Sequence, residues 1–152
     1  MKYLPQVLVL TLLAGVIFAF ATLFGEFRYF YNLEGTIWKF TDCATTNPFL
    51  TPCFFGAIAF VIALIWSAVN AFKLTGEKQT RHYKYLSFLL AGGTLFAWGN
   101  FAITVVKYYQ DAGNIACGAV PITHPLQSSC FIGAMIYTAA FTVCLMVRRK
   151  LQ

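Results

Sequence analysis

The sequence has 152 residues, of which 59% are hydrophobic and 11% are charged, and its mean hydropathy is +0.69. Soluble domains carry about 25% charged residues, so this composition excludes an ordinary water-soluble domain and indicates a membrane protein. The formal net charge of +6 does not indicate nucleic-acid binding, because the basic residues flank apolar runs, where they determine orientation in a membrane.

Four apolar runs follow one another along the chain, at residues 4–27, 53–72, 85–106 and 130–147. Each has about the 20 residues that a helix needs to cross a hydrocarbon core, and a helix satisfies its own backbone polar groups. We therefore expect an all-α membrane protein, a bundle of four transmembrane helices in a single membrane domain over residues 1–152. Outer loops are expected near 28–52 and 107–129, and an inner loop at 73–84.

The second half of the chain repeats the first at an offset of 77 positions. The matched segments are Leu12-Leu13-Ala14-Gly15 with Leu89-Leu90-Ala91-Gly92, Pro48 with Pro125, Cys53-Phe54 with Cys130-Phe131, and Gly56-Ala57 with Gly133-Ala134. Because these matches need no gap, they predict two tandem copies of one helical hairpin. Repeat unit one is expected at 1–75 and repeat unit two at 78–152.

Each expected outer loop ends in a proline followed three residues later by a hydroxyl side chain. Asn47-Pro48 precedes Thr51, and His124-Pro125 precedes Ser128. Proline disfavours helical geometry in the residue before it, and a Ser or Thr hydroxyl can cap a helix by accepting a backbone hydrogen bond. We expect these segments to start the second and fourth spans.

Charged residues divide unequally between the two sides of the predicted membrane. One side has Lys2, Lys73, Lys78, Arg81, Lys84, Arg148, Arg149 and Lys150 against Glu77, and the other has Arg28, Lys39 and Lys107 against Glu26, Glu34, Asp42 and Asp111. Cytoplasmic loops carry an excess of Lys and Arg. Both termini and the inner loop are therefore expected in the cytoplasm, with the cysteine-containing loops on the extracytoplasmic side.

Four of the five cysteines fall on the predicted outer side, and Cys144 lies within the fourth span as an apolar filler. Outer compartments are often oxidising, and the duplication favours bridges within each unit, Cys43–Cys53 and Cys117–Cys130. Each bridge would contribute roughly 3 kcal/mol of stability in the chain-entropy treatment.

A second interpretation of the same cysteines is redox chemistry. Four helices, both ends inside and two outer cysteine pairs resemble the vitamin K epoxide reductase and bacterial thiol oxidase families. Those families use Cys-x-x-Cys, whereas the pairs here are separated by nine and twelve residues. The resemblance implies a membrane thiol–disulfide oxidoreductase coupled to a quinone cofactor, in which Cys53 and Cys130 at the helix starts would be the reactive thiols.

A polar pocket is a further possibility. Glu26 lies near the outer end of the first span and Asn100 on the outer half of the third, so the two are expected at similar depth. An ionisable residue near a membrane span is a functional candidate by default. Such a pocket would suit a small-solute or lipid-binding carrier.

The sequence contains no recognisable hydrolytic, nucleotide-binding or paired-carboxylate motif, and no convincing metal-ligand spacing. An enzyme is therefore not favoured. The function favoured by the sequence is that of a structural or accessory membrane subunit that contacts the lipid bilayer and either other membrane subunits or further copies of itself. Neither a nucleic-acid partner nor a resident cofactor is expected for it, and the oxidoreductase and carrier interpretations stay open.

Overall fold

The computed structural model describes residues 3–110, 115–117 and 120–151. Its four long helices are α1 (Leu4–Glu34), α2 (Pro52–Phe72), α3 (Gly76–Gln110) and α4 (Ser129–Leu151). Short 3-10 turns, η1 (Pro48–Leu50) and η2 (Pro125–Gln127), precede α2 and α4. Strands β1 (Ile115–Cys117) and β2 (Val120–Ile122) form a small antiparallel hairpin with Cys117 paired to Val120.

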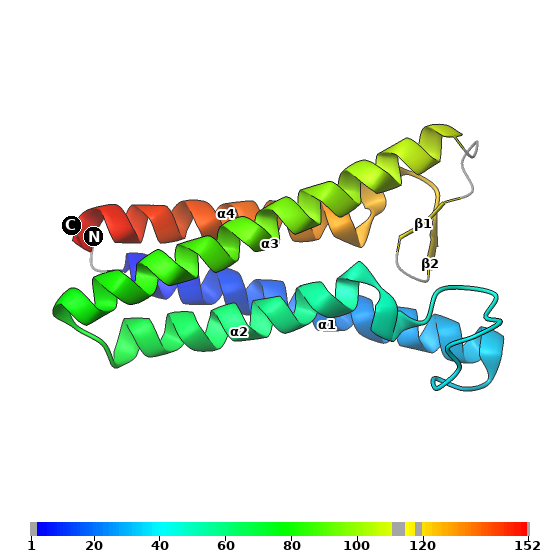
Figure 1. The fold of residues 1–152 in the computed structure, drawn as a ribbon, viewed down its shortest axis with the longest axis horizontal. Helices are drawn as coiled ribbons and strands as arrows, with labels where there is room; N and C mark the ends of the chain where they lie inside the picture. The colour runs from blue at the N-terminus through cyan, green and yellow to red at the C-terminus, as the bar shows by residue number, and fades with distance from the viewer. Residues whose placement is uncertain (1–2, 111–114, 118–119, 152) are drawn as a thin grey trace.

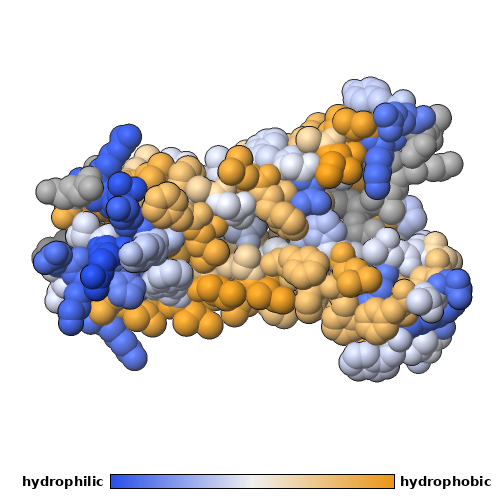
Figure 2. Space-filling model, viewed as in Figure 1, coloured by the Kyte–Doolittle hydropathy of each residue, from blue (hydrophilic) through white to orange (hydrophobic). Residues whose placement is uncertain are grey.

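The prediction of an all-α protein with four potential membrane spans is confirmed. All four long helices in the described ranges are long and apolar enough to cross a membrane. Large apolar side chains face outward along them, among them Phe24 at 70% exposed and Leu95 at 75%. Figure 2 shows these side chains as a broad apolar belt with hydrophilic residues at both ends of the bundle. Such a surface is stable in lipid, and the chain is an integral membrane protein.

The helices run as two antiparallel hairpins, α1–α2 and α3–α4, which pack side by side (Figure 1). The start of α1, the end of α4 and the α2–α3 connection lie at one end, called here the inner end; the opposite, outer end carries the long loops. At the outer end, β1 contacts α3 and β2 contacts α1, so the small hairpin connects the two halves of the bundle.

The inner half of the bundle is tightly packed. Side chains with no exposed surface come from all four helices there: Leu8, Leu12, Ala63, Ser67, Asn70, Tyr83, Leu86, Leu90, Ala140 and Cys144. The Cys144 thiol lies 3.9 Å from the carbonyl oxygen of Tyr83, within this apolar core. Interiors of this kind leave little room for a ligand, which directs attention to the outer half.

The predicted inner loop at 73–84 is much shorter than expected. The chain leaves α2 at Phe72 and enters α3 at Gly76, whose φ of +67° suits glycine and permits the tight reversal. The polar residues that follow are helical, with Glu77 in the first turn of α3, where an acidic side chain complements the helix dipole. Hydropathy identified only the apolar part of α3, so the expected end of the inner loop at residue 84 was wrong.

The two proline segments do precede α2 and α4, but their caps differ from the expected ones. Asn47 Oδ1 accepts a hydrogen bond from Phe49 N at 2.9 Å, and His124 Nδ1 accepts one from Leu126 N at 3.2 Å. Ser128 Oγ accepts from Phe131 N at 3.2 Å, which confirms its capping role. The expectation that the Thr51 side chain caps α2 was wrong. Its hydroxyl instead forms hydrogen bonds with Glu26 and with the Pro48 carbonyl oxygen.

The loop after α1 is organised by side chains. Gly35 ends the helix with a φ of +70°, and its N–H bonds Tyr31 O. Glu34 then pairs with Lys39 at 2.5 Å and accepts a hydrogen bond from Ala44 N at 2.6 Å. The Lys39 ammonium group donates a hydrogen bond to the Glu34 carboxylate, and this bond raises the pKa of Lys39 above the ordinary lysine value. These contacts hold the loop against the outer end of α1.

Candidate functional site

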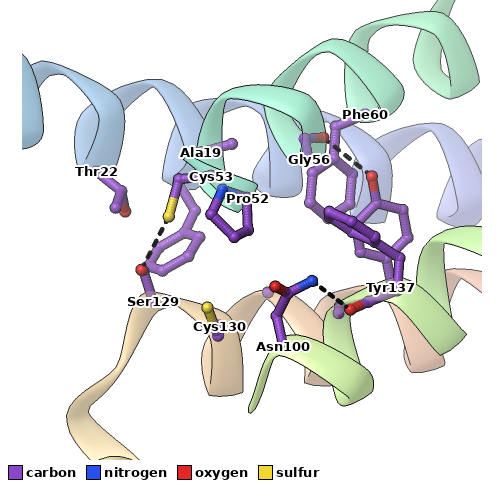
Figure 3. Close-up of a pocket in the computed structure, with 14 residues that line it drawn as sticks. Ala19, Thr22, Pro52, Cys53, Gly56, Phe60, Asn100, Ser129, Cys130 and Tyr137 are labelled. Atoms are coloured by element: carbon purple, nitrogen blue, oxygen red, sulfur yellow. Dashed lines mark hydrogen bonds between the residues drawn. The ribbon is translucent and has the colours of Figure 1, made fainter. Parts of the chain in front are cut away.

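A small cavity lies at the centre of the outer half of the bundle, with a volume of about 50 Å³. All four helices contribute to its wall: Phe18, Ala19 and Thr22 from α1; Pro52, Cys53, Gly56 and Phe60 from α2; Phe96, Ala97 and Asn100 from α3; and Ser129, Cys130, Gly133 and Tyr137 from α4. Figure 3 shows these side chains converging from opposite helices. We call this space the central cavity.

Two aromatic rings close the inner end of the central cavity. Phe60 of α2 and Tyr137 of α4 stack with ring centroids 3.9 Å apart and an interplanar angle of 19°. The Tyr137 hydroxyl donates a hydrogen bond to the Gly56 carbonyl at 3.0 Å (Figure 3). The stacked pair separates the cavity from the solid inner core.

Two glycines allow these rings to lie flat against the neighbouring helices. A Cβ on Gly15 of α1 would lie 2.6 Å from the Phe60 ring, and a Cβ on Gly93 of α3 would lie 2.5 Å from the Tyr137 ring. No side chain fits at such distances. Small residues therefore permit close helix approach here, as the sequence pattern indicates.

The walls from α2 and α4 use the same spacing. Cys53, Gly56 and Phe60 line one side, and Cys130, Gly133 and Tyr137 line the other, each pair separated by 77 positions. Residues three or four apart share a helix face, which brings all three of each set to the cavity. The cysteines lie on the first turn of their helices.

One of the two cavity cysteines contacts the residue that precedes the other in the sequence. Cys53 Sγ lies 3.2 Å from Ser129 Oγ, and either group can be the donor. Ser129 is followed directly by Cys130, which lines the opposite wall (Figure 3). The structure thus brings together the two residues that the redox interpretation singled out, although their sulfur atoms are not at bonding distance.

The predicted Cys43–Cys53 disulfide is absent from this structure. Cys43 lies in the loop that Glu34 holds, and its thiol donates to Lys39 O at 3.3 Å, whereas Cys53 faces the centre of the bundle. The prediction came from compartment and duplication, neither of which fixes side-chain direction. The predicted Cys117–Cys130 pair depends on the Cys117 side chain, which falls outside the described residues.

A second cavity adjoins the first on the side of the β-hairpin, with a volume of about 220 Å³. Its wall contains Glu26, Gln127, Val120, Ile122 and Ile132 together with three residues shared with the central cavity, Phe18, Thr22 and Ser129. We call it the outer cavity. The shared residues form the boundary between the two spaces.

Glu26 is 1% exposed, and its Oε2 lies 2.9 Å from Thr51 Oγ1. Asn100 lines the central cavity, and its Nδ2 donates to Phe96 O in its own helix at 2.8 Å. The two residues of the expected polar pocket therefore lie in adjoining cavities and not in one. The sequence missed Gln127 and the hairpin, because no periodicity or motif marks residues that reach a site from a loop.

Apolar walls with a few polar groups are typical of sites for small molecules. No group of three potential metal ligands occurs among the residues that the structure describes. Neither a family model, nor a curated protein, nor a solved structure matches the chain.

Proposed function

We propose that the protein binds a small amphipathic molecule, such as a lipid or a lipid-soluble metabolite, between the outer halves of its helices. The observation that carries this proposal is the pair of adjoining cavities, whose walls combine aromatic and aliphatic side chains with Thr22, Asn100 and Ser129. This is the carrier or lipid-binding interpretation of the sequence, and we propose the residues that line the two cavities as its site.

Two glycines on the wall of the central cavity support the proposal, because they leave space there unfilled. A Cβ on Gly56 or Gly133 would meet no described atom within 4 Å, in contrast to Gly15 and Gly93. Protein interiors are usually packed to high density. Gly56 and Gly133 are half-buried and line the central cavity, so the open space beside them is consistent with a wall that accommodates a ligand.

The test is to fill the cavity without disturbing the helices. In Gly56→Leu and Gly133→Leu the new side chain would occupy the central cavity, and Gly99→Leu is the matched control because Gly99 is exposed on α3 and also has open space. We expect a photoactivatable lipid to label the wild type and Gly99→Leu at the cavity wall, with at least about tenfold less labelling in the two cavity variants. Equal labelling in all four proteins would overturn the proposal.

A second candidate is the thiol–disulfide oxidoreductase, favoured by the presence of Cys53 and Cys130 on facing walls of one cavity. In this reaction the two thiols lose two electrons and two protons, an Sγ–Sγ bond forms, and a quinone in the cavity becomes a hydroquinone. The helix starts must move closer for the bond to form, because the sulfur atoms lie beyond bonding distance.

This candidate is tested by mixing the reduced protein with a short-chain quinone. We expect one hydroquinone per chain and a Cys53–Cys130 peptide in a non-reducing digest, both lost in Cys53→Ser and in Cys130→Ser. Cys144 is an internal control, since it is buried in the inner core and should stay reduced. Failure to form hydroquinone would remove the oxidoreductase while leaving ligand binding intact.

The accessory-subunit role predicted from the sequence is a weaker proposal. Exposed apolar faces supply its only support, and a lipid-exposed bundle requires such faces without any partner. Binding of other subunits or self-association would add to ligand binding and would not replace it.

We propose in addition that the inner end of the bundle faces the cytoplasm and that the two halves arose by duplication. The first proposal is supported by the basic residues in the last turn of α4 and at the start of α3. The second is supported by the offset of 77 positions that relates η1 to η2 and Phe60 to Tyr137.

A further inference from the structure

The outer cavity has one feature that the central cavity lacks, a buried acidic side chain in its wall. Glu26 is 1% exposed, whereas Asp42 and Glu77 are exposed on the surface. Burying a carboxyl group in an apolar bundle costs free energy unless it is hydrogen-bonded. An ionisable residue retained at such a position is a functional candidate.

Glu26 is held in place by the start of α2. Thr51 is 1% exposed, and its hydroxyl lies 2.9 Å from Glu26 Oε2 and 2.8 Å from the Pro48 carbonyl oxygen. Pro48 is itself buried in η1. The carboxyl group is therefore fixed against a rigid turn, as a group that orients a ligand must be.

The remaining polar groups of the outer cavity are neutral. Thr22 and Ser129 contribute hydroxyl groups and Gln127 an amide, and the other lining residues are apolar. The cavity of about 220 Å³ is several times the roughly 30 Å³ that one water occupies in the liquid, so it can hold a head group of several atoms. A carboxyl group on the wall can accept a hydrogen bond from a hydroxyl or an amine, and in its ionised form it repels an anionic group.

We propose that the molecule bound by this protein carries a head group that donates hydrogen bonds, a hydroxyl or an amine. This head group occupies the outer cavity and binds Glu26. The apolar part of the molecule extends past Phe18 and Thr22 into the central cavity. This inference rests on the proposed function, since it names the chemical class of ligand for the same site. It excludes fatty acids and other amphiphiles with anionic heads as the preferred ligands.

The experiment compares three photoactivatable probes with the same short alkyl chain, because the central cavity has a volume of only about 50 Å³: a monoacylglycerol, an amine and a fatty acid. We expect the wild type to bind the hydroxyl and amine probes at least about tenfold more tightly than the fatty acid. In Glu26→Gln, binding of the amine should fall by about tenfold or more, and the preference against the fatty acid should disappear. Glu77→Gln is the matched control, because it removes an exposed carboxylate far from the site.

Thr51→Val provides a second variant that keeps the Glu26 carboxyl group but removes the hydrogen bond between that group and the Thr51 hydroxyl. It should reduce the preference for donor heads even if Glu26→Gln does not fold, and thermal unfolding of each variant serves as the folding control. A wild type that binds the fatty acid as tightly as the amine would overturn the head-group inference while leaving the proposed function standing. If none of the probes binds saturably, the proposed function itself fails.

Discussion

At the scale of single residues, the glycines inside the long helices that the structure describes fall into two groups that the sequence does not distinguish. Gly15 and Gly93 lie so close to aromatic rings that a Cβ would clash, whereas Gly56, Gly92, Gly99 and Gly133 have open space around the same position. The first group determines how closely the helices approach. Within the second, Gly56 and Gly133 leave the central cavity unfilled.

The adjacent pair Gly92 and Gly93 offers a direct test of this division. Gly93→Ala places a Cβ about where the Tyr137 ring already lies, so we expect a loss of roughly 1–3 kcal/mol in the free energy of unfolding. Gly92→Ala meets no described atom and should be neutral or stabilising by up to about 1 kcal/mol, because alanine favours the helix. Unfolding in detergent with increasing denaturant measures both. Equal stability of the two variants would contradict the close contact at Gly93.

Thr51 shows why part of the site was beyond the sequence. Local spacing predicted a cap for α2, and the same logic succeeded at Ser128. Thr51 instead bonds Glu26, which lies 25 positions earlier in the chain. A local sequence motif cannot indicate a hydrogen-bond partner, such as Glu26, that lies on another helix and is brought close by tertiary packing.

At the scale of elements, hydropathy was sufficient to identify all four long helices and insufficient to locate their ends. Apolar length identified the membrane-crossing part of each helix, but α1 continues to Glu34 and α3 starts at Gly76, both outside the apolar runs. Polar turns of a helix that leave the membrane have no hydropathy signal. The β-hairpin was missed for a related reason, because strands of three residues are too short to show an alternating pattern.

The loop after α1 leads to a prediction about charge. Glu34 binds both Lys39 and the backbone of Ala44, so Glu34→Gln should loosen the loop and increase its rate of cleavage by a protease, with Glu77→Gln as the control. Since the pKa of Lys39 is raised by this contact, the contact is complete below the ordinary lysine pKa and is lost as pH rises through the raised value. Cleavage of the wild-type loop should therefore accelerate under strongly alkaline conditions, in which Lys39 loses its proton, and under strongly acidic conditions, in which the Glu34 carboxylate gains one. Unchanged cleavage of Glu34→Gln would show that Glu34 does not hold the loop.

At the scale of the whole molecule, the bundle is solid at one end and hollow at the other. The inner half is filled by leucines and Tyr83 with no exposed surface, and the outer half contains two adjoining cavities closed off by the Phe60–Tyr137 stack. The sequence predicted the polar residues Glu26 and Asn100 and the cysteines of this half. It could not predict the cavities, because empty space depends on how the helices diverge.

The proposed function requires that an amphipathic molecule occupies these cavities. Native mass spectrometry of the protein released from its own membrane tests this most directly. We predict that the wild type and Gly99→Leu retain one additional small molecule of defined mass, and that Gly133→Leu, folded to the same extent, is recovered without it. Recovery of wild type and Gly133→Leu with the same bound mass, or of wild type with none, would contradict the account.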